Sequence, residues 1–283
     1  MTTVAPMAEF DLDHVAIASL DIKATLQTAV GELGGVVFHG GDGYGFRWLQ
    51  TRLGTPGMTG TTGMTIELLE VWQPEVNDFL ARFLERHGPG VHHMTFKVRD
   101  IEAALARCAA AGVEPVGVNL ENPAWREAFL QPKQAHGTVV QLAQTSDEWQ
   151  ISDAINAAEH RGEPLGTPMW WPVPPARGAN PVTLQRVVLG SPDRTAATAF
   201  FAGLLGATTT TDDNDADDND NDDATDLAWP GGGCVRIVDA DRAGFLRLEG
   251  TRGSGGIAGS GGNHDRADTT VDLSGAPVLI CSR

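Results

Sequence analysis

Two stretches of the chain share one residue pattern at a constant spacing. One is L-D-H-V-A-I-A-S-L-D at residues 12–21 and the other is V-H-H-M-T-F-K-V-R-D at residues 91–100, an offset of 79 residues. The alignment needs no gap and places His14 on His93 and Asp21 on Asp100. Each stretch alternates like a strand and ends on an aspartate that can cap a following helix. A fixed offset with matching punctuation indicates a duplicated supersecondary unit.

The residues after each copy predict the same order of elements, β-α-β-β-β. In the first unit we expect a strand over 12–19, a helix over 22–33 and strands at 36–38, 44–52 and 64–72. In the second unit we expect a strand over 91–98, a helix over 101–111 and strands near 114–118, 126–130 and 138–143. An amphipathic helix over 74–87 is predicted to connect the units. The fold class is therefore α+β, built from paired βαβββ modules.

A third copy follows after a proline-rich stretch. L-Q-R-V-V-L-G-S-P-D at residues 184–193 places Leu184 on Leu12 and Arg186 on His14, and residues 195–205 complete it with a helix. Residues 245–248 and 278–281 suggest a decayed fourth copy. We predict a metal-bearing domain over 1–146, a helix and proline-rich linker over 147–181, and a degenerate second domain over 182–283 with an Asp-rich insertion at 212–226.

Charge and cysteine usage exclude some functions. The formal net charge is −17, which argues against nucleic acid or an anionic membrane surface as partner, because both require basic footprints. Nine of the 37 acidic residues lie in the 212–226 run, which lacks the glycine and final glutamate of a calcium loop and reads as a solvated insertion. Three widely spaced cysteines and no segment of about 18 apolar residues favour a cytoplasmic protein.

Four polar residues occupy equivalent places on predicted strands of the first two units. His14 and His93 stand on the opening strands, whereas Glu67 and Gln141 interrupt the apolar closing strands. Taken singly, each has an ordinary structural explanation, but their repetition favours a shared site. A buried carboxylate without a partner is costly, and two imidazoles with carboxylate and amide oxygens suit a divalent transition metal. His92 should face the other way and is interpreted as structural.

Cations and indoles near these strands are candidates for substrate binding. Positive side chains able to hold a carboxylate or phosphate, or to serve as plain surface charges, are Arg47, Arg126 and Lys133. Trp48 and Trp125 either wall a pocket or pack in the core.

Several motifs resemble the vicinal oxygen chelate superfamily, and residues 12–144 are similar to its methylmalonyl-CoA epimerases and to glyoxalase I. The matching motifs are D-H-V-A at 13–16, G-V-H-H-M at 90–94, D-I-E-A at 100–103, and F-L-Q-P-K with H-G-T-V-V-Q-L across 129–142. The resemblance implies cupped mixed sheets in tandem and one divalent ion (Co, Ni, Mn, Zn or Fe). It assigns the ligand role to His14, Glu67, His93 and Gln141.

The same resemblance implies a metal-dependent isomerase or lyase that forms an enolate from a small carbonyl or carboxylate substrate, with a thioester among the candidates. Epimerases of this type use two glutamates, but this chain has Gln141 at one place and Arg47, Trp48 and Gln50 on the strand of the other. Because an amide cannot abstract a proton, Glu67 or Glu70 would supply the base. The catalytic candidates are Glu67 and Gln141.

Two alternatives stay open: an iron-dependent dioxygenase and a non-catalytic drug- or ligand-binding protein. The isomerase or lyase needs a base beside the metal, the dioxygenase needs redox-active iron, and the binder needs neither metal nor His14. The expected partner is a small molecule, and the chain is either a monomer whose second half mimics a dimer partner or a homodimer.

Overall fold

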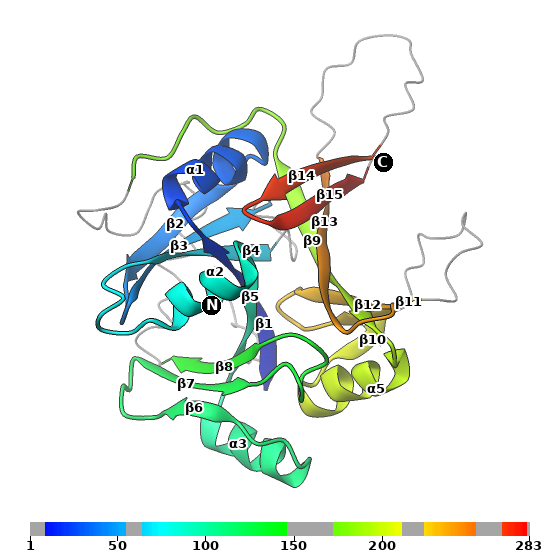
Figure 1. Ribbon diagram of the computed structural model, residues 1–283. Coiled ribbons are helices and arrows are strands. Elements are labelled where there is room, and N and C mark those ends of the chain that lie inside the picture. The colour runs from blue at the N-terminus through cyan, green and yellow to red at the C-terminus, as the bar shows by residue number, and fades with distance from the viewer. Residues whose placement is uncertain (1–8, 55–63, 146–171, 211–223, 253–267, 282–283) are drawn as a thin grey trace, which may run out of the picture. The chain divides into compact units, whose positions relative to one another are not determined.

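The computed structural model describes residues 9–54, 64–145, 172–210, 224–252 and 268–281. Its strands form two mixed sheets, with the few helices outside them (Figure 1). Sheet A has eight strands in the order β2-β3-β4-β1-β5-β8-β7-β6, and sheet B has seven in the order β10-β11-β12-β9-β13-β15-β14. Counted from β2 in sheet A and from β10 in sheet B, the two orders correspond strand by strand. The opening strands lie at the centre of each sheet: β1 and β5 in sheet A, β9 and β13 in sheet B. The predicted α+β class with paired modules is confirmed.

Sheet A contains the first two predicted units. Its strands are β1 (Phe10–Ser19), β2 (Val36–Asp42), β3 (Phe46–Leu53), β4 (Met64–Val71), β5 (Gly90–Val98), β6 (Val116–Asn119), β7 (Trp125–Leu130) and β8 (Val140–Thr145). Its helices are α1 (Ile22–Leu26), which continues as the π-helix η1 (Gln27–Glu32), α2 (Phe79–His87) and α3 (Ile101–Ala110). The connecting helix starts at Phe79 rather than at Pro74, because residues 73–76 form a turn in which the Val76 N–H donates to the Gln73 carbonyl.

Sheet B contains the residues predicted as a third copy and as a decayed fourth copy. Its strands are β9 (Val182–Ser191), β10 (Thr208–Thr210), β11 (Ala224–Ala228), β12 (Cys234–Asp239), β13 (Gly244–Arg252), β14 (Thr269–Leu273) and β15 (Ala276–Cys281). Its helix α5 (Arg194–Ala199) continues as a π-helix, η2 (Phe200–Leu204), as α1 does. Most of the predicted helix and linker over 147–181, and most of the Asp-rich insertion at 212–226, lie outside the described residues.

The aspartates predicted to cap the helices do so in all three copies. The Asp21 carboxylate accepts from the Ala24 N–H at 3.1 Å, the Asp100 carboxylate from the Ala103 N–H at 3.1 Å, and the Asp193 carboxylate from the Ala196 N–H at 2.9 Å. Such a bond satisfies a backbone donor that the first helical turn leaves unpaired. The closing strands repeat a second cap, since Glu70 accepts from the Ile22 N–H and Gln144 from the Ile101 N–H, both at 3.0 Å.

The chain packs as two compact units, each of which combines parts of both sheets. Unit 1 holds the described residues within 9–14, 93–145, 188–210 and 224–246. Its core includes Phe96, whose ring meets the indole of Trp229 at 5.0 Å between centroids. The Trp229 indole N–H donates to the Leu205 carbonyl at 2.7 Å, and the Gly231 N–H donates to the Asp11 carboxylate at 3.1 Å.

Unit 2 holds the described residues within 15–54, 64–92, 172–187, 247–252 and 268–281. The chain preceding β9 is fixed to the end of η1, because the Arg177 guanidinium donates to the Gly34 carbonyl at 2.6 Å. The turn between β14 and β15 needs a glycine at position 275. Its φ is +77°, and a Cβ there would lie 2.1 Å from the Pro89 carbonyl oxygen, so any side chain would clash.

Candidate metal centre

His14 is fixed on β1 by an aspartate that precedes it in sequence. The imidazole is buried, with 1% of its surface exposed. Its Nδ1 lies 2.7 Å from the Asp13 carboxylate. A carboxylate can only accept a hydrogen bond, so Nδ1 carries the proton and Nε2 is the nitrogen available to a metal.

Asp13 is held in its charged form by its neighbours. Burial alone would raise the pKa of this carboxyl, but Lys97 and the hydrogen bond from His14 outweigh burial and hold the pKa well below its usual value. The Lys97 ammonium lies 3.3 Å from the Asp13 carboxylate. Asp13 therefore stays an acceptor that orients His14 across the neutral pH range.

The ligand atoms of His14, Glu67 and His93 all lie within 4.8 Å of one another. The residues come from β1, β4 and β5, and the two imidazole rings stand edge to face with centroids 6.1 Å apart. Nitrogen and oxygen ligands bind a transition metal at about 2.0–2.2 Å, so atoms on one ion lie at most about 4.4 Å apart. A shift of a few tenths of an ångström would bring these atoms to that spacing, so the residues fit one divalent ion. Within the described part of the chain this is the only such group of histidine, cysteine or acidic residues.

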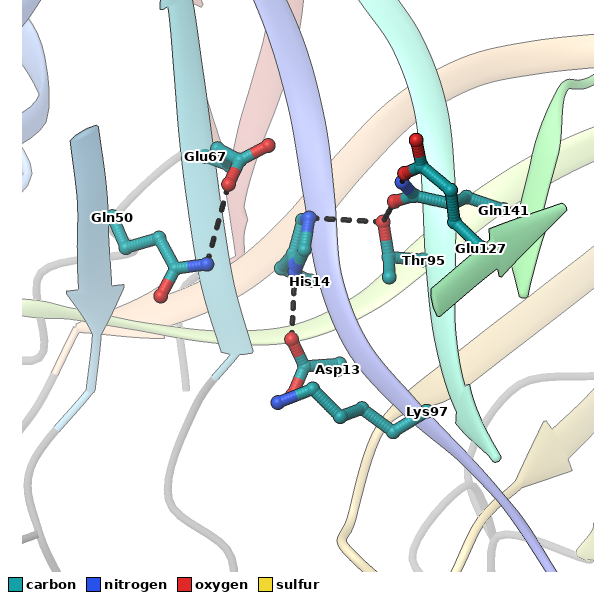
Figure 2. Close-up of polar contacts among 8 residues, drawn as sticks. All are labelled: Asp13, His14, Gln50, Glu67, Thr95, Lys97, Glu127 and Gln141. Carbon is teal, nitrogen blue, oxygen red and sulfur yellow. Dashed lines mark hydrogen bonds and ion pairs between the residues drawn. The ribbon is translucent and has the colours of Figure 1, made fainter. Parts of the chain in front are cut away.

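Glu67 is positioned by the neighbouring strand. Gln50 on β3 pairs directly with Glu67 on β4 in the antiparallel register, and its Nε2 donates to the Glu67 carboxylate at 3.3 Å (Figure 2). Glu70 lies on the opposite face of β4 by strand alternation and caps α1. Glu67 rather than Glu70 is thus the carboxylate near the histidines.

Gln141 and His14 both contact the hydroxyl of Thr95. The Thr95 hydroxyl donates to Gln141 Oε1 at 2.6 Å and lies 2.9 Å from His14 Nε2. On the other side, Gln141 Nε2 donates to the Glu127 carboxylate at 2.7 Å (Figure 2). The parallel register of β5 and β8 pairs Thr95 with Gln141, which brings these side chains to one face.

The sequence assigned no role in this site to Asp13, Thr95 or Glu127, and it placed Gln50 only on the strand where epimerases have their second glutamate. A signal for two of them was present, because Thr95 lies two residues after His93, and Gln50 lies two residues after Trp48, on predicted strands. Glu127 could not be assigned without the register of β7 against β8. Asp13 lies in the D-H-V-A motif at 13–16, but the motif assigned a role only to His14.

Two of the predicted substrate-binding residues, Trp48 and Arg47, lie on opposite faces of β3. Trp48 faces the same side of β3 as Gln50 and packs on Ala16, Ala18 and Leu69. Arg47 faces the other side, with its guanidinium 3.3 Å above the centre of the Trp72 ring. These positions leave the roles of both residues as predictions.

The other three candidates lie on β7 and in the turn that follows it. The Trp125 indole N–H donates to Glu127 at 2.9 Å, so Trp125 belongs to the Gln141 surroundings. Arg126 points to the opposite face of β7 by alternation. Lys133 is exposed in the turn before β8. None of the substrate-binding assignments is tested by these positions.

His92 packs beneath α2. Its ring contacts Phe79 and Phe83, with centroids at 5.5 Å and 4.6 Å. Burial lowers its pKa from 6.5 to about 4, although the nearby Glu67 charge opposes this shift. His92 is therefore neutral at pH 7, as a packed side chain should be.

Comparisons with known proteins agree with this architecture. Residues 13–129 match the family described as the Glyoxalase/Bleomycin resistance protein/Dioxygenase superfamily. No curated protein matches the chain. A hypothetical protein from Staphylococcus aureus has a similar fold over 97% of this chain and 100% of its own, with a TM-score of 0.60 and 13% identity.

Two epimerase structures resemble part of the chain. A Streptomyces coelicolor methylmalonyl-CoA epimerase, solved with 2-nitronate-propionyl-CoA, is 26% identical over 49% of this chain and 96% of its own, with a TM-score of 0.42. The epimerase from Mycobacterium tuberculosis is 23% identical over 53% of this chain and 97% of its own, also with a TM-score of 0.42.

Among the described residues, no helix is long and apolar enough to cross a bilayer. The match over residues 13–129 agrees with the resemblance to the vicinal oxygen chelate superfamily that the motifs of this segment indicated.

Proposed function

We propose that sheet A binds one divalent metal ion and that the protein is a metal-dependent isomerase or lyase acting on a small carbonyl or carboxylate compound. The observation that carries the proposal is the convergence of His14, Glu67 and His93 within 4.8 Å. Gln141 is the proposed fourth ligand, through Oε1. The superfamily match of residues 13–129 supports the assignment.

When bound, the metal would act as a Lewis acid that polarises a substrate oxygen and so acidifies the neighbouring C–H bond. Glu67 is the proposed proton acceptor, because a carboxylate can take a proton whereas the amide of Gln141 cannot. His14 and His93 hold the site, and Asp13 keeps the His14 tautomer fixed. A thioester substrate, a cytoplasmic location and a monomer or homodimer belong to the same proposal.

The test is proton exchange at the substrate α-carbon. Methylmalonyl-CoA, a thioester with an acidic α-carbon, is a suitable first probe in D₂O with the cobalt-loaded protein. We expect deuterium at the α-carbon with the wild type and none with Glu67→Gln. Metal uptake without exchange on a panel of small thioesters and 2-oxo acids would leave a binding protein.

A second candidate is an iron-dependent dioxygenase. Two histidines and one carboxylate are the donor set of non-haem iron oxygenases, and His14, His93 and Glu67 provide that set. Iron in the purified protein, together with oxygen consumption on a catechol or 2-oxo acid, would favour this function over the isomerase.

A further inference from the structure

Gln141 has an amide group whose two ends face chemically different partners. One end meets the Thr95 hydroxyl at 2.6 Å, and the other meets the Glu127 carboxylate at 2.7 Å. Only 5% of Gln141 and none of Thr95 is exposed. Water therefore has little access to replace either partner, and the orientation of the amide matters energetically.

The Glu127 carboxylate decides which way the amide points. A carboxylate has no proton to give, so the end of Gln141 that faces it must be the NH₂ group. The opposite orientation would place the amide oxygen against the carboxylate, with two acceptors facing each other and no proton between them. Oε1 is thereby turned to Thr95, whose hydroxyl also contacts His14 Nε2 at 2.9 Å.

Glu127 is itself held in place by β7. The Trp125 indole N–H donates to Glu127 Oε2 at 2.9 Å, which is the same oxygen that accepts from Gln141. Trp125, Glu127 and Phe129 alternate on one face of β7, and the register places Phe129 opposite Gln141 and Glu127 opposite Ala143. Ala143 is small, so the Glu127 side chain can reach diagonally to Gln141.

We propose that Glu127 is a positioning residue that makes Gln141 an oxygen ligand. A metal cation can bind the amide oxygen but not the NH₂ group, so the ligand value of Gln141 depends on Glu127. This inference rests on the proposed metal centre and adds a residue to it. It also explains how an amide at this position can serve a metal site: the carboxylate lies one strand away and fixes the amide.

The test compares metal affinity in variants that keep or remove the acceptor. Cobalt(II) affinity is measured by competition with a chelator for wild type, Glu127→Leu, Glu127→Gln and Glu121→Leu. Glu121 is an exposed carboxylate before β7 and serves as the control for loss of charge and added apolar surface. Mutation of a residue that hydrogen-bonds to a metal ligand typically lowers metal affinity by about 10- to 100-fold.

We expect Glu127→Leu to weaken cobalt binding by about 10-fold or more. Glu127→Gln keeps an acceptor oxygen and should stay within about 3-fold of wild type, as should Glu121→Leu. In the Gln141→Glu background, Glu127→Gln should instead strengthen cobalt binding. Two carboxylates then face each other, and the substitution relieves their repulsion. A purely structural role for Glu127 would weaken binding in both backgrounds.

Side-chain amide NMR gives a second measurement that needs no metal and covers a Glu127→Leu protein that folds poorly. The ¹⁵N-labelled Gln141 NH₂ pair, assigned by its loss in Gln141→Glu, should be protected from solvent exchange in the wild type and stay protected in Glu127→Gln, which keeps an acceptor oxygen. An NH₂ pair that exchanges in the wild type as fast as that of a solvent-exposed glutamine would contradict the bond to Glu127.

Equal cobalt affinity for wild type and Glu127→Leu, or no strengthening by Glu127→Gln in the Gln141→Glu background, would overturn the role of Glu127 alone. A wild-type protein that takes up no cobalt would overturn the metal centre and this inference together.

Discussion

The opening strands β1 and β9 are built alike but carry different chemistry. Both are ten residues long, and their burial patterns differ at one position only. Each is followed by the same turn, in which a serine hydroxyl accepts from the aspartate N–H two residues on, at 3.1 Å in both copies. At the fifth position, however, β1 has His14 and β9 has Arg186.

Arg186 forms an ion pair, whereas His14 at the equivalent position belongs to the candidate metal site. Arg186 Nε donates to Glu249 at 2.9 Å, and Arg247 Nε donates to the other oxygen of Glu249 at 2.7 Å. Glu249 is buried, with 5% of its surface exposed. Elsewhere in sheet B, Arg236 forms a two-bonded pair with the buried Asp226. Buried polar side chains thus need partners in both sheets. In sheet A the two histidines and Glu67 suit a metal ion, whereas in sheet B arginines and carboxylates neutralise one another.

The largest expected effect comes from breaking the ion pair of sheet B. Arg186→Leu leaves the buried Glu249 with Arg247 alone, and removal of one partner from a buried pair costs about 3 kcal/mol of the free energy of unfolding. Arg194→Leu, which breaks the more exposed pair with Asp239, should cost less than about 1 kcal/mol. Urea unfolding measures both. Equal losses would mean that the Glu249 cluster is no more than a surface pair.

The next effect concerns the aspartate beside His14. The equivalent residue of β9 is Gln185, so the carboxylate accompanies the histidine and not the arginine. Asp13→Asn can present an NH₂ group to Nδ1 and no longer selects the His14 tautomer, so we expect metal affinity to fall about 10-fold. Competition with a chelator measures the metal affinity, and the control substitution Gln185→Asp should leave that affinity unchanged. An unchanged affinity for Asp13→Asn would remove Asp13 from the site.

A third prediction concerns Asp11, where β9 has Thr183. Burial, together with the nearby Asp13 charge, raises the pKa of Asp11 from 3.8 to about 6, although the bond from Gly231 opposes this. Between these pH values the folded protein binds more protons than the unfolded chain, so its stability falls as pH rises through that window.

Asp11→Asn keeps an acceptor for Gly231 and removes this pH dependence. Because Asp11 is partly exposed, the variant should be more stable than wild type by about 1–2 kcal/mol at pH 7.5 and nearly equal to it near pH 3.5. Urea unfolding at the two pH values checks this, and a gain of equal size at both would contradict the raised pKa.

The smallest effect should be shared by the two sheets. Asp21→Ala and Asp193→Ala each remove the cap of an opening helix, at an expected cost of about 1 kcal/mol. Similar losses on thermal or urea unfolding would show that the repeated framework is energetically as well as geometrically equivalent. A loss confined to one sheet would break that part of the comparison.

Local patterns made much of the fold predictable from the sequence. Period-two alternation located the strands, and the repeated aspartates located the helix starts, because both signals depend on neighbouring residues. The missing parts depend on partners far along the chain. The small edge strand β10 is T-T-T and has no apolar alternation, and β14 has only Val271 and Leu273 as apolar residues. Both strands are defined by their pairing, with β11 and with β15.

The candidate site shows the same division. His14, His93 and Glu67 were predicted from repetition along the sequence, and the structure brings their ligand atoms together. Glu127 depends on the pairing of β7 with β8, which the sequence does not specify to the residue. Whether the Gln141 amide turns its oxygen or its nitrogen toward Thr95 is likewise decided by its surroundings and not by residue identity.

The most direct test of the central claim is elemental analysis of the protein purified without added metal, beside the His14→Ala/His93→Ala variant and Arg186→Leu. We predict close to one divalent metal ion per chain in the wild type and in Arg186→Leu, and none in the double histidine variant. Absence of metal from all three proteins, even after incubation with cobalt, nickel, manganese, zinc or iron, would contradict the metal centre.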